Sequence, residues 1–336
     1  MKATSGIGMA IRVRGWVLVT TVSLGFAPSM PAWAKRGTPQ PVLSASAMAV
    51  ADEFSADAAE RIFKEGGNAV DAAVAVGFAM AVTYPRAGNL GGGGFMVIHL
   101  ASGNRDTAID YRETAPAAAT STMFLDAQGN ADPKKSRDSG LAVGVPGTVA
   151  GLAMAEAKYG SGKFTLADLI APAIDLAANG FRVRDDLADS LVTSDPRLAR
   201  WPSTASIFFN GAAPLAEGDR LLQFDLADTL RAIAERGPAA FYKGRIADRI
   251  AAAVKGAGGI MMADDLAHYR AIERPVVRGS YRGYDVVSMP PPSSGGVHLI
   301  EMLNILEGYD LGKLPREQAL HDEIEAMKRA YADRAV

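Results

Sequence analysis

The sequence predicts an α+β fold, because a strand hairpin lies next to segments with clear helical patterns. Four glycines, Gly91 to Gly94, lead into the apolar segment 95–100, and a turn-rich stretch separates it from a second segment, 107–111. This order is typical of a β-hairpin. Residues 69–84 are apolar on nearly every side and are followed by a proline, which indicates a buried helix.

Further helices are predicted before and after this hairpin. Residues 45–51 are small and apolar and predict a first strand, and Ser55 or Asp57 could cap a helix that ends near residue 65. Beyond the hairpin, a proline suits the first turn of a helix over 146–159. Thr165 can cap another helix, over 165–179, which a glycine ends.

The second half of the chain is predicted to be rich in helices and to contain a second pair of strands. Residues 117–140 resemble a loop, and 185–258 contain several helices separated by turn residues. Strands are expected over 274–278 and 284–289, joined by a turn. Two more helices, over 297–306 and 317–334, complete the pattern.

The first 34 residues have the features of an export signal. Arg12 and Arg14 precede a short apolar segment, 15–26, and Ala32-Trp33-Ala34 matches a signal-peptidase site. The apolar segment is shorter than the roughly 20 residues that a membrane-spanning helix needs. We expect cleavage after Ala34 and a periplasmic or secreted protein without a membrane anchor.

After cleavage, residues 35–44 are expected to be a loose tail and residues 45–336 to be one folded region. Hydrophobic residues make up 49% and charged residues 21% of the sequence, which is ordinary for a globular protein. The net charge of −2 gives no basic field for nucleic acid or an anionic membrane. The chain contains no cysteine and only four isolated histidines, so neither a metal site nor a thiol nucleophile is expected. No cofactor is predicted either, because Gly160-Ser161-Gly162-Lys163 lacks the remainder of a phosphate-binding loop.

Arg112 is the candidate binding residue. It stands where the second strand of the hairpin ends, within Asp110-Tyr111-Arg112-Glu113. A guanidinium group is a planar fork that can hold a carboxylate with two hydrogen bonds, and a glycine run allows close approach of backbone. Together they indicate a site for a small acidic molecule. The alternative is a tight turn beside a solvated pair of Arg112 and Glu113, worth about 0–1 kcal/mol.

Four ordered motifs resemble those of the γ-glutamyltransferases (γ-glutamyl transpeptidases). The stretch 89–116 resembles the signature of their large subunit, and three further segments match in the same order. These are 66–73 (GGNAVDAA), 144–147 (GVPG) and 289–296 (MPPPSSGG). The resemblance runs from about Ala47 to the last residue, and four motifs in order are far more specific than one.

The resemblance implies an N-terminal-nucleophile hydrolase fold, in which two sheets lie between helix layers in a four-layer αββα sandwich. Such enzymes are precursors that cleave themselves into a large and a small subunit. The new N-terminal threonine of the small subunit is the nucleophile, and its own amine is the base. The enzyme takes the γ-glutamyl group from glutathione or related compounds and passes it to water, an amino acid or a dipeptide.

By the same resemblance, Arg112 matches the arginine that holds the α-carboxylate of the glutamyl group. Asp110 and Glu113 also match the motif, but no ligand contact is carried over to them, and the glycines are expected to be structural. The family nucleophile follows a helix such as 317–334 by some tens of residues, whereas this sequence ends at Val336. We therefore expect no catalytic threonine in this chain, an incomplete fold, and no activity without the small subunit of the same precursor.

Two alternatives remain open from the sequence. A related acylase would have the same fold and would act on glutaryl or β-lactam side chains. A non-catalytic exported protein that binds glutamyl compounds would need no nucleophile. Arg112 favours an α-amino-acid substrate without excluding either alternative.

Overall fold

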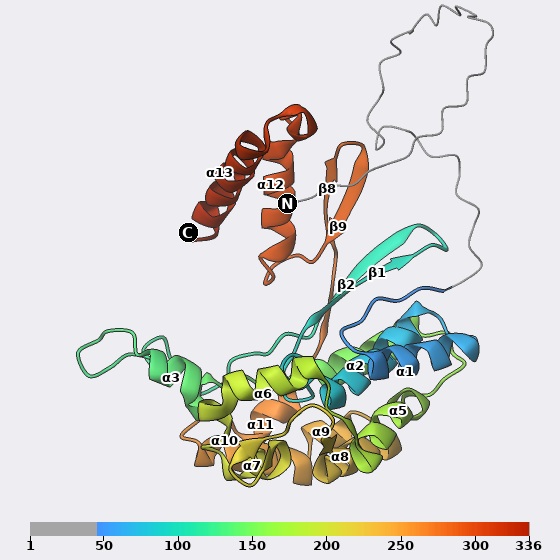
Figure 1. Ribbon diagram of the computed structural model, residues 1–336, viewed down its shortest axis with the longest axis vertical. Helices are drawn as coiled ribbons and strands as arrows, with labels where there is room; N and C mark the ends of the chain where they lie inside the picture. Colours follow the sequence, from blue (N-terminus) through green and yellow to red (C-terminus); the bar gives the residue numbers. More distant parts are fainter. Residues whose placement is uncertain (1–45, 336) are drawn as a thin grey trace, which may run out of the picture. The chain divides into compact units, whose positions relative to one another are not determined.

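Helices form most of the chain that the structure, a computed structural model, describes, which is residues 46–335 (Figure 1). The helices are α1 Glu53–Lys64, α2 Ala69–Thr83, α3 Pro133–Asp138, α4 Thr148–Tyr159, α5 Leu166–Asn179, α6 Asp185–Leu198, α7 Pro202–Phe208, α8 Phe224–Arg236, α9 Ala239–Tyr242, α10 Arg245–Gly256, α11 Ala263–His268, α12 Gly295–Leu306 and α13 Arg316–Arg334. Short 3-10 helices cover Gly140–Ala142 and Leu311–Lys313. The strands are β1 Phe95–Leu100, β2 Arg105–Asp110, β3 Phe181–Arg182, β4 Phe209–Asn210, β5 Ala213–Pro214, β6 Arg220–Leu221, β7 Ile272–Arg274, β8 Val277–Tyr281 and β9 Tyr284–Ser288. The predicted α+β class is confirmed, while the expected export signal and tail lie outside the described residues.

Helix α1 begins earlier than predicted, and no strand precedes it in the described residues. The carboxylate of Asp52 caps the helix by accepting the Ser55 N–H at 2.8 Å, so Ser55 lies inside the first turn. Residues 46–51 have no regular structure, and the strand expected there is wrong for this stretch. A short apolar stretch without a partner strand does not form a ladder of hydrogen bonds.

Helix α2 forms as predicted and is the centre of the core. The Asn68 side chain accepts the N–H groups of Val70 and Asp71, and the Asp71 carboxylate accepts the Asn68 N–H in return. This capping box satisfies N–H groups that the start of a helix leaves unpaired. Phe78 in this helix is fully buried. The small residues of α2 allow close packing against helices, and a methyl group at Gly77 would lie 2.9 Å from the Leu152 side chain in α4.

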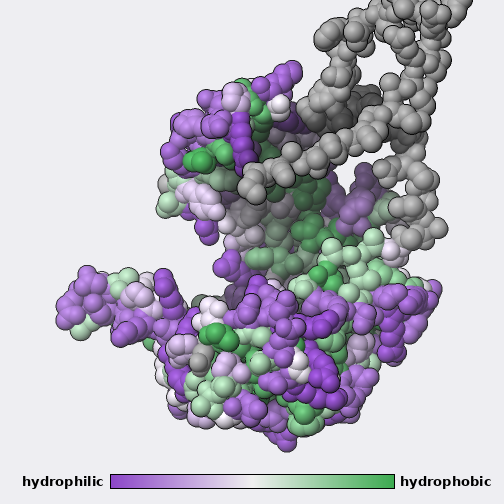
Figure 2. Space-filling view, viewed as in Figure 1, coloured by the Kyte–Doolittle hydropathy of each residue, from purple (hydrophilic) through white to green (hydrophobic). Residues whose placement is uncertain are grey.

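The main sheet has three antiparallel strands in the order β1-β2-β7. In the hairpin, Phe95 pairs with Asp110 and Leu100 with Arg105, while Ala108 of β2 pairs with Arg274 of β7. Helix α4 packs against β2, and helices α1, α2, α5 and α8 continue the core beyond it. Hydrophilic residues cover much of the visible face of the helices (Figure 2).

The strand predicted over 274–278 is two strands. Proline at position 275 cannot donate to a ladder, so β7 ends at Arg274 and β8 begins at Val277. Strand β8 pairs with β9, and the turn between them has positive φ at Arg282 (50°) and Gly283 (81°). Such φ angles match the tight turns that two-residue hairpins favour. Helix α12 packs on this hairpin and on α13.

The stretch predicted to be a loop, 117–140, contains the short helix α3, whose first residue is a proline.

Among the helices of residues 46–335, none has both the length and the apolar character needed to cross a membrane.

Candidate functional site

Two of the four sequence motifs are joined by hydrogen bonds where β2 ends. The Tyr111 N–H donates to the Gly94 carbonyl at 3.0 Å, which extends the hairpin into the glycine run. The N–H groups of Gly147 and Thr148 both donate to the Gly92 carbonyl, at 2.7 and 3.1 Å. An isolated antiparallel bridge joins Thr114 to residue 145. The segments 89–116 and 144–148 therefore form one hydrogen-bonded unit.

The glycines of these motifs allow backbone to approach backbone. A methyl group at Gly93 would lie 2.5 Å from the Tyr111 carbonyl oxygen and 2.8 Å from the Glu113 nitrogen. A methyl group at Gly147 would lie 2.0 Å from the Tyr111 carbonyl oxygen and from the Tyr269 hydroxyl. Real side chains do not tolerate such distances, so only glycine fits at these positions.

The backbone of Arg112 is held on both sides. Its N–H donates to Asp110 Oδ1 at 3.1 Å, and its carbonyl accepts the Tyr269 hydroxyl at 2.8 Å. Asp110 is 6% exposed, and its Oδ2 accepts Nε of Arg274 at 2.8 Å. Since β7 supplies Arg274 and the segment after α11 supplies Tyr269, residues distant in sequence fix this turn.

The side chain of Arg112, by contrast, is exposed and has only one weak contact. Its Nη1 lies 3.4 Å from the carbonyl oxygen of Pro292, which belongs to the fourth motif. Within residues 46–335, no carboxylate forms an ion pair with it, and the surface pair with Glu113 considered from the sequence is not formed. The backbone of Arg112 is thus fixed, while its guanidinium group is free to bind a ligand.

Two stacked tyrosines lie against this turn. The rings of Tyr242 and Tyr269 are 5.7 Å apart and nearly parallel, at 8°. Tyr242 donates its hydroxyl to the Pro146 carbonyl at 3.0 Å and accepts the Ala150 N–H at 3.1 Å. Burial, aided by the negative charges of Asp110 and Glu113, raises the pKa of Tyr269 above its usual range. The hydroxyl therefore stays protonated and can donate to the Arg112 carbonyl.

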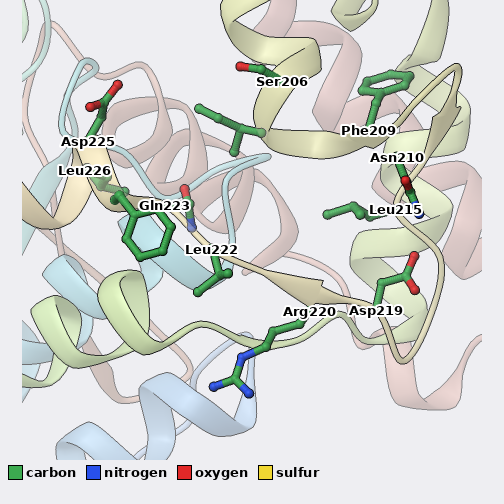
Figure 3. A pocket seen from close by; sticks show the side chains of 12 residues that line it. Ser206, Phe209, Asn210, Leu215, Asp219, Arg220, Leu222, Gln223, Asp225 and Leu226 are labelled. Carbon is green, nitrogen blue, oxygen red and sulfur yellow. The ribbon is translucent and has the colours of Figure 1, made fainter.

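The pocket drawn in Figure 3 lies elsewhere in the molecule. It has a volume of about 600 Å³, and its lining runs from Ser206 to Leu226, including Arg220, Gln223 and Asp225 (Figure 3). Its lining includes no residue of the four motifs. A second cavity, of about 420 Å³, is lined by Thr114 and Tyr269 and so adjoins the site, but Arg112 does not line it.

The motif that predicts Arg112 also contains Asp110, but two other residues that shape this turn were not singled out from the sequence. Tyr269 is a single tyrosine outside all four motifs, so no local pattern marks it. Asn89 stands at the edge of the glycine motif, and its Oδ1 accepts both the Gly92 N–H at 2.9 Å and the Thr148 hydroxyl at 2.5 Å. In the described part of the chain, no group of three or more His, Asp or Glu side chains is placed to hold a metal ion.

Both the sequence and the fold of this chain match known proteins. Residues 55–336 match the family described as gamma-glutamyltranspeptidase. The chain is 51% identical to the glutathione hydrolase proenzyme of Escherichia coli (strain K12), over 91% of this chain and 51% of that protein. It is 41% identical to the acylase ACY 1 proenzyme of Pseudomonas sp. (strain V22), over 88% of this chain and 54% of that protein.

A solved structure shares the fold. The gamma-glutamyltranspeptidase of Helicobacter pylori matches with a TM-score of 0.84 and 46% identity, over 88% of this chain and 85% of that chain. This similarity confirms the predicted N-terminal-nucleophile hydrolase fold. The chain spans about half the length of the curated relatives that it matches.

Proposed function

Because this chain belongs to the gamma-glutamyltranspeptidase family, we propose that it forms the large-subunit part of an enzyme that transfers or hydrolyses γ-glutamyl groups. Glutathione and related γ-glutamyl compounds are the proposed donors, and water, amino acids or dipeptides are the acceptors. The observation that carries this proposal is the Arg112 guanidinium, which is exposed, unpaired among the described residues, and fixed through its backbone.

Arg112 would hold the α-carboxylate of the donor with two charge-assisted hydrogen bonds. Fixing that end of the glutamyl group places its γ-carbonyl carbon at a constant distance from the clamp, where a nucleophile can attack. The nucleophile would be the N-terminal threonine of a small subunit from the same precursor. Its hydroxyl oxygen would form an ester with the γ-carbonyl while its own amine takes the proton and passes it to the leaving amine.

Export is part of the same proposal. Residues 1–34 would direct the precursor out of the cytoplasm and be removed after Ala34, which places the mature enzyme in the periplasm or the medium. Neither a cofactor nor a nucleic acid partner is needed for this chemistry.

The test is to replace Arg112 in the enzyme assembled with its small subunit. Arg112→Lys keeps the charge but loses the planar fork, and Arg112→Ala loses both. We expect kcat/KM for a γ-glutamyl anilide to fall by about tenfold to a hundredfold in each variant, mainly through KM, since charge-assisted hydrogen bonds are worth about 1.5–3 kcal/mol. Unchanged kcat/KM in both variants would remove Arg112 from the site.

An acylase is the second candidate function, because of the 41% identity to acylase ACY 1. A glutaryl group carries its carboxylate at the same distance from the reacting carbonyl as a γ-glutamyl group, and lacks only the α-ammonium group. Arg112 would hold both equally well, so it cannot distinguish them. Comparing γ-glutamyl anilide with glutaryl anilide decides the question: a higher kcat/KM for the first supports the transferase, and for the second the acylase.

A further inference from the structure

Tyr269 reaches the candidate clamp from a distant part of the chain. It follows helix α11, and its hydroxyl is 2.8 Å from the Arg112 carbonyl oxygen, across 157 residues of sequence. No other described hydrogen bond to that carbonyl is present in residues 46–335. Tyr269 is 6% exposed, so its position is set by packing.

This contact helps to fix the direction in which the Arg112 side chain leaves the backbone. The Arg112 N–H is already tied to Asp110, so the Tyr269 bond fixes the opposite side of the same residue. With both peptide groups held, the Cα–Cβ bond has one direction, and the guanidinium explores a limited volume next to Pro292. Without the hydroxyl, the next restraint on this side is the bridge between Thr114 and residue 145, so the peptide that follows Arg112 gains freedom to turn and to shift the side chain.

The surroundings of Tyr269 keep its hydroxyl in place. Its ring stacks on that of Tyr242 at 5.7 Å, a contact that needs the Tyr242 ring and not its hydroxyl. Gly147 leaves the space that the Tyr269 hydroxyl occupies, because a methyl group there would lie 2.0 Å from that oxygen. Glycine at position 147 is thus required for the contact.

We infer that Tyr269 is a positioning residue, which orients Arg112 for the donor carboxylate by holding the Arg112 carbonyl. This inference rests on the proposed function, because it needs Arg112 to be the clamp. Tyr269 itself touches neither the donor nor the reacting atoms. Its removal should therefore weaken donor binding while leaving the chemical step intact.

The test is a double-mutant cycle in the assembled enzyme with a γ-glutamyl anilide donor. Tyr269→Phe removes only the hydroxyl, and we expect KM for the donor to rise by about threefold to tenfold, the value of one hydrogen bond, with kcat within twofold of the parent. In an Arg112→Ala background, Tyr269→Phe should change KM by less than twofold, because it acts through Arg112.

Tyr242→Phe is the matched control. It removes the hydroxyl of the other ring in the stack, which bonds to Pro146 and Ala150 and not to Arg112. We expect its donor KM to stay within twofold of the parent, although both variants lose a similar amount of stability in urea unfolding.

The outcomes separate this inference from the proposed function. An unchanged KM in Tyr269→Phe, the same rise in KM in Tyr242→Phe, or full additivity with Arg112→Ala would overturn the positioning role while leaving the clamp standing. An unchanged KM in Arg112→Ala would overturn the clamp itself, and the role of Tyr269 with it.

Discussion

Arg112 combines a fixed backbone with a free side chain, the arrangement that the proposed clamp needs. The Asp110 carboxylate accepts its N–H, the Tyr269 hydroxyl donates to its carbonyl, and the guanidinium has a single 3.4 Å contact. A charged group that already had a carboxylate partner would have to give up that partner to bind a ligand. A restricted backbone has less conformational entropy to lose when a ligand binds, and the guanidinium itself stays unoccupied.

The same turn predicts that alanine substitution destabilises the protein at Gly93 but not at Gly91. In Gly93→Ala, the new methyl group would lie 2.5 Å from the Tyr111 carbonyl oxygen, and backbone atoms cannot rotate out of its way. We expect the free energy of unfolding to fall by about 1–3 kcal/mol, as for an overpacked core, measured by urea unfolding. Activity of the assembled enzyme should fall as well, because the methyl group would displace the segment after β2, which includes Arg112.

Gly91→Ala is the control for that experiment. A methyl group at position 91 would meet no atom within 4 Å, and Gly91 does not have a positive φ. Its unfolding free energy should match that of the parent within about 0.5 kcal/mol. Equal destabilisation by both substitutions would mean that the glycine run is needed for flexibility rather than for close approach.

At the scale of elements, polar contacts join the sheet to the helices. Glu273 in β7 accepts hydrogen bonds from Thr107 in β2 and from Lys158 and Tyr159 at the end of α4. One carboxylate thus ties two strands to a helix. The same end of α4 also contacts α2. The side-chain amide of Asn68 donates to the Tyr159 carbonyl at 2.8 Å, so the start of α2 is fixed to the end of α4.

The Glu273 cluster predicts a loss of stability in acid. Hydrogen bonds from Lys158, Tyr159 and Thr107 lower the pKa of Glu273 from 4.5 to about 2. A carboxyl group whose pKa is lower in the folded state stabilises the fold above the unfolded value, and this stabilisation is lost as pH falls from about 4.5 towards 2. We expect Glu273→Gln to flatten the decline of unfolding free energy in that range.

The expected contribution of Glu273 to the free energy of unfolding is about 1 kcal/mol or less at pH 7. The reason is that its side chain is 34% exposed and solvent screens its pair with Lys158. Urea unfolding at a series of pH values measures it, with Glu317→Gln on α13 as the control, which lies outside the cluster. A Glu273→Gln protein with the same pH profile as its parent would show that the cluster adds nothing to stability.

Elements with local signals were predictable from the sequence, and elements made by distant pairing were not. Helix α5 was predicted from its cap at Thr165 and the glycine after it, and its bounds are confirmed. The two-residue strands β3 to β6 were missed, because so short a strand depends wholly on its partner. The same division applies to the site: a motif predicted Arg112, whereas Tyr269 is placed only by tertiary packing.

At the scale of the whole molecule, helix α13 has an apolar stripe that nothing in residues 46–335 covers. Leu320, Ile324, Met327 and Tyr331 are 45%, 51%, 48% and 62% exposed, at helical spacing on one side. Ala326 and Ala330 of the same helix are buried. Hydrophobic patches are visible over α12 and α13 among hydrophilic residues (Figure 2). A stripe of this kind normally packs against a partner.

This stripe predicts that the 336-residue chain, expressed by itself, associates with itself and binds a hydrophobic dye. Replacing Leu320, Ile324 and Met327 together by serine removes most of the stripe, and we expect dye fluorescence to fall about threefold or more as the apolar area is lost. Sedimentation velocity should then show a shift towards the monomer. The control replaces Glu317, Gln318 and Arg329 by serine, which changes three exposed polar positions of the same helix and keeps its net charge. A parent chain that stays monomeric and dark with the dye at every concentration would mean that this face is covered within the chain itself, because an uncovered stripe of that size does not stay inert in water.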